Sequence, residues 1–307
     1  MNESSALQLQ TRYGISGALR FEAGQNGLTR AMVTTPQAEA QVYLHGAHVT
    51  HFQPRGEQPV LFMSARSRFE PGKPIRGGIP IVFPWFGKLA SDPAAPMHGV
   101  ARLAEWRIQS ATQAGDGSVT LVLGLDTDKG THPGWPHACE LRYHVGIGSA
   151  LDIALEVRNC SQQAITFEEA LHTYLAVSDV RQVSIAGLAG TEYLDKTDSM
   201  SRRTQGAESI RITGETDRVY LDTKTTCVLD DPSGGRRLLV DKRGSNVTVV
   251  WNPWIAKAHA MPDFGDDEWA QMLCLETCNA ADNAVTLQPG HHHEIQATIR
   301  SEPRSGE

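Results

Sequence analysis

Alternation of apolar and polar residues with a period of two constrains the fold of this 307-residue chain more than any other feature. Apolar residues occupy every second position from Tyr143 to Ile147 and again from Leu151 to Val157. This spacing places them on one face of a β-strand. Turn sequences such as AGDG, DPSGG and KRGSN separate runs of this kind, and no amphipathic helix longer than three turns is evident. The pattern predicts an all-β fold, a large antiparallel sandwich or barrel with few short helices.

Four local expectations follow from the same pattern. Residues 164–177 are predicted to form one strand that carries Leu171, Thr173, Leu175 and Val177 on one face and His172 on the other. The KRGSN turn is predicted to close a hairpin between LLVD and VTVVW. The proline-rich residues 90–97 are predicted to form a loop inside one domain that spans residues 1–307. The polar ends, about residues 1–8 and 301–307, are expected to be loose.

Charge and cysteine content exclude several classes of protein. The net charge of −7 argues against a general binder of nucleic acid or anionic membranes. No apolar run approaches the ~20 residues that span a bilayer, and the first residues lack the pattern of a secretory signal. Five cysteines are few and odd in number, which favours reduced thiols in a cytoplasmic protein. We expect a monomer.

The segment RGGIPIVFPWFG, which begins at Arg76, is one of two candidate ligand-binding segments. Its two glycines allow a ligand to approach the backbone closely, although they are equally compatible with a buried bulge beside a solvated arginine. The second segment, HGVAR, contains His98 and Arg102, which are either a turn histidine and a surface arginine or two groups that converge on an anion. Together Arg76 and Arg102 can clamp a phosphate through bidentate hydrogen bonds.

Three further residues are candidates for chemistry. His172 lies in an apolar segment, where a histidine is either a satisfied core residue or a proton donor and acceptor near neutral pH. Glu276 lies in the apolar run MLCLETC, where a carboxylate is either paired or acts as a base with a raised pKa. Asp217 either forms a turn or accepts hydrogen bonds from sugar hydroxyls. Trp251 and Trp254 either face a sugar ring or belong to the core.

Histidine and cysteine spacing argues against a metal site. Adjacent residues in a strand point to opposite faces, so His291, His292 and His293 cannot converge on one ion. Histidines 45, 48 and 51 likewise do not share one face. Cys274 and Cys278 lack the second pair of ligands that a zinc site requires.

Taken together, six segments resemble the aldose 1-epimerase (galactose mutarotase-like) superfamily, with the closer match to its hexose-6-phosphate branch. They occur in the family's order from about residue 40 to 295. The segments are RGGIPIVFPWFG (76–87), HGVAR (98–102), LHTYLAVSDV (171–180), GLAGTEYLDK (187–196), TDRVY (216–220) and WNPW…DF…MLCLE (251–276). The resemblance implies a β-supersandwich with a sugar cleft across one sheet and a hexose 6-phosphate as substrate.

The resemblance also implies roles for particular residues. His172 and Glu276 correspond to the catalytic pair, and Arg76 and Arg102 to substrate-binding positions. Asp217 corresponds to a contact with a sugar hydroxyl, and His98 to a position near the sugar. Met97 stands where relatives in this branch often carry glutamine, so one sugar contact is either lost or made by the backbone.

These residue types fit mutarotation, the exchange of α and β anomers by ring opening. Glu276 would remove the proton of the anomeric hydroxyl while a protonated His172 donates one to the ring oxygen. Neither a metal nor an organic cofactor is required. Two alternatives are an epimerase that acts on unphosphorylated sugar and a carbohydrate-binding protein without turnover.

Overall fold

Strands dominate the computed structural model, which describes residues 3–304. The first half of the chain forms β1 (Leu19–Ala23), β2 (Thr29–Thr34), β3 (Ala38–Tyr43), β4 (His48–Pro54), β5 (Ile81–Val82), β6 (Arg107–Gln113), β7 (Val119–Thr127), β8 (Cys139–Ile147) and β9 (Leu151–Asn159). The middle forms β10 (Ile165–Phe167), β11 (Glu169–Leu171), β12 (Tyr174–Ala176), β13 (Ser184–Ala186), β14 (Glu192–Asp195), β15 (Ser201–Thr204) and β16 (Thr216–Tyr220). The last part forms β17 (Cys227–Asp231), β18 (Arg236–Arg243), β19 (Val247–Asn252), β20 (Met272–Asn279), β21 (Val285–Leu287) and β22 (His292–Pro303).

Helices are few and short, as the sequence predicts. The α-helices are α1 (Glu3–Tyr13) and α2 (Trp254–Ala260). The 3-10 turns are η1 (Gln25–Gly27), η2 (Ala101–Leu103), η3 (Lys196–Asp198), η4 (Glu268–Gln271) and η5 (Ala281–Asn283). Neither α-helix within residues 3–304 has the length and apolar character needed to cross a membrane.

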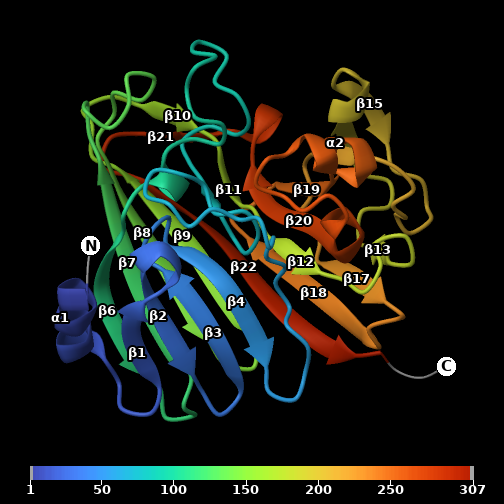
Figure 1. Cartoon of the computed structure of the whole chain (residues 1–307). Helices are drawn as coiled ribbons and strands as arrows, with labels where there is room; N and C mark the ends of the chain where they lie inside the picture. The colour runs from blue at the N-terminus through green and yellow to red at the C-terminus, as the bar shows by residue number, and fades with distance from the viewer. Residues whose placement is uncertain (1–2, 305–307) are drawn as a thin grey trace.

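Antiparallel pairing joins the strands into four sheets (Figure 1). The β20 sheet has the order β15-β14-β16-β19-β20-β11-β5, with β12 also paired to β20. The β22 sheet has the order β13-β17-β18-β22-β9-β8-β7-β6. A four-stranded sheet, β1-β2-β3-β4, and the pair β10-β21 complete the molecule.

The sheets pack on one another through their apolar faces. β20 contacts β22, and β3 contacts β8. Figure 1 shows the four-stranded sheet in front of β6–β9. In β8, buried and half-buried residues alternate from Cys139 to Ile147, as the period of two predicts. The antiparallel sandwich expected from the sequence is therefore confirmed.

Two local predictions are wrong, both because tertiary contacts change the path of the chain. Residues 164–177 form three short strands, and His172 and Thr173 lie in the break between β11 and β12. Every residue from 169 to 175 is buried, so the expected division into two faces does not hold. The KRGSN turn does not close a hairpin, because β18 pairs with β17 and β22 whereas β19 pairs with β16 and β20. The turn carries the chain from one large sheet to the other.

The ends of the chain are also more regular than expected. α1 begins at Glu3, and β22 continues to Pro303, which lies opposite Arg236 of β18. Residues 3–8 and 301–303 therefore belong to regular elements, residues 1–2 and 305–307 lie outside the described part, and looseness of the tails stays a prediction. Residues 90–97 form a loop without helix or strand, as predicted.

Candidate active site

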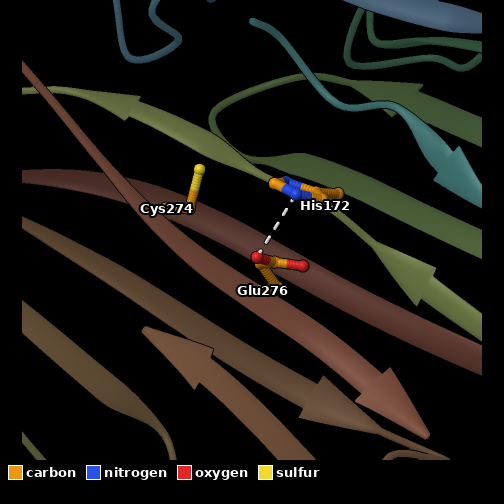
Figure 2. Close-up of side chains that lie close together, drawn as sticks. All are labelled: His172, Cys274 and Glu276. Atoms are coloured by element: carbon orange, nitrogen blue, oxygen red, sulfur yellow. Dashed lines mark ion pairs between the residues drawn. The ribbon is translucent and has the colours of Figure 1, made fainter. Parts of the chain in front are cut away.

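Glu276 and His172 face each other across neighbouring strands of the β20 sheet. Leu171 lies opposite Thr277, and Tyr174 lies opposite Cys274. The register is thus the same on both sides of the break between β11 and β12, which puts His172 directly across from Glu276. His172 Nε2 lies 3.4 Å from Glu276 Oε1 (Figure 2). The two residues named by the sequence therefore form a contact pair.

Aromatic rings fix the orientation of the His172 imidazole. It stacks on Tyr174 at 4.9 Å between centroids and meets the rings of His98 and Trp251 edge-on. Its backbone N–H donates to the Pro80 carbonyl at 3.0 Å. Within the described structure the buried Nδ1 has no hydrogen-bond partner. The imidazole thus directs Nε2 toward Glu276 by packing rather than through a second hydrogen bond.

Burial favours the neutral form of both partners. Burial and the nearby Asp217 carboxylate raise the pKa of Glu276 well above 4.5. Burial, with the positive charges of Arg102 and Arg76, holds the pKa of His172 well below 6.5. Both shifts favour a protonated Glu276 and a neutral His172 in the unliganded pair.

The two predicted arginines lie near the pair but in different states. Arg76 forms an ion pair with Asp263, with 3.1 Å between Nη2 and Oδ2, and its Nη1 donates to the Tyr174 hydroxyl at 3.0 Å. Arg102 donates from Nη2 to the Met97 carbonyl at 2.6 Å, and its buried Nε has no partner among the described residues. Burial and the neighbouring Arg76 lower the pKa of Arg102 to about 10, which leaves it charged at neutral pH. Arg102 therefore has donor capacity left for an anion.

Two glycines let the backbone reach this arrangement. Gly78 has φ +59°, and a Cβ there would lie 2.3 Å from the Val49 carbonyl oxygen. Gly99 has φ +74°, and its Cβ would lie 2.0 Å from the Phe83 carbonyl oxygen. Gly78 and Gly99 thus serve close backbone packing. The arginines beside them are not the solvated or surface groups of the alternative interpretation, because Arg76 is paired with Asp263 and Arg102 is buried.

Residues 97 and 98 contribute in different ways. The Met97 side chain is 47% exposed, and only its carbonyl is shown to join the site, through Arg102. His98 accepts a hydrogen bond from the Gly87 N–H at Nδ1, so the neutral ring carries its proton on Nε2. Burial and Arg102 hold the pKa of His98 well below 6.5, so this ring is a neutral donor beside His172.

Asp217 lies on the same sheet and pairs with a residue that the sequence analysis missed. Asp217 is buried on β16, opposite Trp251. Lys196 Nζ lies 3.2 Å from Asp217 Oδ2 and 5.2 Å from the centre of the Phe86 ring. Lys196 is the last residue of the quoted segment GLAGTEYLDK, but its partner becomes visible only when β14 and β16 pair. Asp263 was missed in the same way, although it lies in the quoted DF.

Cys274 lies beside the His172–Glu276 pair. Within residues 3–304, His172, Cys274 and Glu276 form the one group of histidine, cysteine and carboxylate side chains whose ligand atoms lie within 4.8 Å of one another. The spacing of Cys274 and Cys278 in the sequence gave no sign of this group. In the histidine run at 291–293, His293 contacts the buried Glu169, with 3.0 Å between His293 Nε2 and Glu169 Oε1.

Partial exposure marks the open side of the site. The side chains of His172 and Glu276 are 8% and 1% exposed, whereas those of Lys196 and Arg76 are 31% and 20% exposed. A separate surface hollow, lined by residues of β7–β9 and β22, contains none of the predicted site residues. Converging charged groups, and not this hollow, therefore mark the candidate site.

Comparison with known proteins identifies the family and the fold. Residues 31–300 match the sequence profile of the aldose 1-epimerase family. A protein of Escherichia coli K12, provisionally named glucose-6-phosphate 1-epimerase, is 35% identical over 268 residues, which cover 87% of this chain and 88% of that protein. A protein of Cenchrus ciliaris with the same provisional name is 34% identical, with 87% and 82% covered.

Solved structures show the same architecture. A Salmonella typhimurium crystal structure, described provisionally as a mutarotase, superposes with a TM-score of 0.88 at 29% identity, covering 95% of this chain and 96% of that one. The galactose 1-epimerase of Lactobacillus acidophilus shares the fold, with a TM-score of 0.72 at 13% identity over 94% and 99% of the chains. With 270 consecutive residues spanned by the family profile, the chain belongs to the aldose 1-epimerase family.

Proposed function

We propose that this chain is an isomerase that interconverts the α and β anomers of glucose 6-phosphate and related hexose 6-phosphates. The observation that carries the proposal is the buried His172–Glu276 pair, which lies beside an arginine with unused donor capacity. The provisional names of the relatives from Escherichia coli and Cenchrus ciliaris support the same substrate class.

The phosphate prepares the pair for proton transfer. An anion bound at Arg102 and Arg76 offsets the positive charge that holds the pKa of His172 down. The same anion also raises the pKa of Glu276, which Arg102 lowers. The reactive state of the pair carries the proton on His172, which leaves Glu276 as a carboxylate base and His172 as an imidazolium acid.

Ring opening follows with both protons accounted for. Glu276 takes the proton of the anomeric hydroxyl, His172 gives its proton to the ring oxygen, and the bond between C1 and the ring oxygen breaks. Rotation about the C1–C2 bond turns the aldehyde, and the ring closes on the other face with the roles of Glu276 and His172 reversed. Each positioned acid or base contributes about 10²–10⁴-fold.

The remaining polar groups hold the sugar. Asp217, kept in place by Lys196, accepts a hydrogen bond from a sugar hydroxyl. His98 donates from Nε2 to a sugar oxygen. Position 97 offers the sugar no side-chain amide, because it is a methionine. Its backbone carbonyl already accepts a hydrogen bond from Arg102.

A polarimetric assay of freshly dissolved α-glucose 6-phosphate beside α-glucose tests the proposal. We expect kcat/KM to be higher for the phosphorylated sugar. Equal or greater activity on glucose would instead assign the chain to the unphosphorylated substrate. Sugar binding without turnover, measured by calorimetry, would make it a carbohydrate-binding protein.

We further propose a cytoplasmic monomer. All five cysteines are free, which supports a reducing compartment. Only four large apolar residues are exposed in the part of the chain that the structure describes, namely Leu7, Met97, Met200 and Ile255, and so few supports a monomer. Light scattering after size-exclusion chromatography measures the oligomeric state, and a stable dimer would contradict the proposed monomer.

A further inference from the structure

Cys274 lies beside the catalytic pair although no step of ring opening uses it. Cys274 and Glu276 are two residues apart on β20, so their side chains share one face of the sheet. Cys274 lies opposite Tyr174 on one neighbouring strand and Trp251 on the other. Figure 2 shows its sulfur on the same side of the sheet as His172 and Glu276.

The three side chains together match the ligand preferences of zinc. Thiolate sulfur, imidazole nitrogen and carboxylate oxygen are the protein ligands of Zn²⁺, and three of them leave one position open. Metal–ligand bonds of ~2.0–2.2 Å place two ligand atoms of a tetrahedron ~3.3–3.6 Å apart. The 3.4 Å between His172 Nε2 and Glu276 Oε1 already meets this requirement. The Cys274 sulfur lies within 4.8 Å of both, and with a Zn–S bond of ~2.3 Å it needs to approach by at most ~1.2 Å to complete the set.

We propose that His172, Cys274 and Glu276 form an inhibitory binding site for soft divalent cations, of which Zn²⁺ and Cd²⁺ are the probes. On binding, the S–H bond of Cys274 and the O–H bond of Glu276 break, sulfur–metal and oxygen–metal bonds form, and both protons leave to solvent. The thiolate and the carboxylate together cancel the charge of the ion, so the complex adds no net charge beside Arg76 and Arg102.

Inhibition follows from the atoms that the metal occupies. Nε2 of His172 and Oε1 of Glu276 are the atoms that exchange protons with the sugar in the proposed function, on which this inference rests. A metal bound to both removes the base and the acid together. The sugar and the ion use the same atoms, so we expect them to compete.

The thiol sets the selectivity among metals. Soft sulfur ligands favour Zn²⁺ and Cd²⁺, whereas Mg²⁺ and Ca²⁺ prefer sets of oxygen ligands. Without Cys274, the remaining histidine and carboxylate are one ligand short of a typical three-residue zinc set. Cys160 is exposed and provides a matched control for ordinary binding of metal by a thiol.

The test is a titration of the mutarotase assay with buffered Zn²⁺, Cd²⁺ or Mg²⁺. We expect inhibition by Zn²⁺ and Cd²⁺ that is competitive with hexose 6-phosphate, and none by Mg²⁺. Relative to each variant's own metal-free rate, C274A and C274S should raise the inhibition constant by at least ~100-fold, the upper end of what loss of an outer-shell partner costs. C160A should leave it unchanged. Equal inhibition of C274A and the unmodified chain, or relief by C278A instead, would overturn the proposal.

Cobalt absorption provides a readout that does not depend on turnover. Co²⁺ bound through a thiolate gives a charge-transfer band, which we expect in the unmodified chain and in C160A but not in C274A or C274S. Circular dichroism confirms that the variants are folded. A missing band in the folded, unmodified chain refutes the metal site even if the chain is inactive on sugars. A band in a chain without mutarotase activity confirms the metal site and refutes the proposed function separately.

Discussion

Replacing Arg102 with methionine should separate recognition of the phosphate from recognition of the sugar. The substitution keeps much of the apolar stem but removes the charge and the unpaired Nε donor of a buried side chain. A charge-assisted hydrogen bond is worth about 1.5–3 kcal/mol. We therefore expect kcat/KM for glucose 6-phosphate to fall about 10- to 150-fold beyond any fall for glucose.

The ratio of the two substrates corrects for indirect damage. Arg102 also holds the Met97 carbonyl, so the variant should lose some activity on both sugars. Only the loss of a phosphate contact changes the ratio of kcat/KM for α-glucose 6-phosphate to that for α-glucose, measured by polarimetry. An unchanged ratio in a folded R102M variant would refute the assignment of Arg102 to the phosphate.

Arg76 provides an informative contrast. Because Arg76 is paired with the buried Asp263 although its own side chain is 20% exposed, R76M leaves that carboxylate without its cation, and an unsatisfied buried group costs about 1–3 kcal/mol of stability. We expect R76M to lower the unfolding free energy in urea, and R76M combined with D263L to restore part of it. R102M leaves no such carboxylate and should be the more stable of the two single variants.

The remaining predictions concern catalysis, acid stability and metal dependence. H172A and E276Q should stay folded by circular dichroism and lose about 10²–10⁴-fold in kcat; a rate near that of the unmodified chain in E276Q would rule out its role as base. His48 donates from Nε2 to the Gly77 carbonyl, and burial lowers its pKa to about 3, so the unfolded state binds more protons below pH 6.5. The contribution of neutral His48 to the free energy of unfolding is therefore fully present above pH 6.5 and is about 2 kcal/mol smaller at pH 5. In urea titrations H48Q should show a smaller fall between pH 7 and pH 5, and an equal fall would contradict the assignment. Exhaustive chelation should not reduce mutarotase activity; a loss that one divalent ion restores would overturn the metal-free mechanism.

Local sequence is sufficient to predict the fold class. The alternation along β8 appears directly as alternating burial, because the pleat of a strand repeats every two residues whatever its neighbours are. In β9 the predicted apolar face is buried as well, and Ala154 on the other face is also buried. The same reasoning fails at residues 164–177 and at the KRGSN turn. There the partner strands decide where the chain breaks and which sheet it joins, and a period of two contains no information about partners.

The candidate site divides in the same way. The sequence by itself identified His172, Glu276, Arg76, Arg102 and Asp217 as residues with the right chemistry, because residue type fixes charge and the capacity to move protons. Contacts between distant segments decided the rest: the ion pairs of Arg76 with Asp263 and of Lys196 with Asp217, and the position of Cys274 beside the pair. A side chain's pKa and free donors depend on burial and on neighbours that only the register of the β20 sheet brings together.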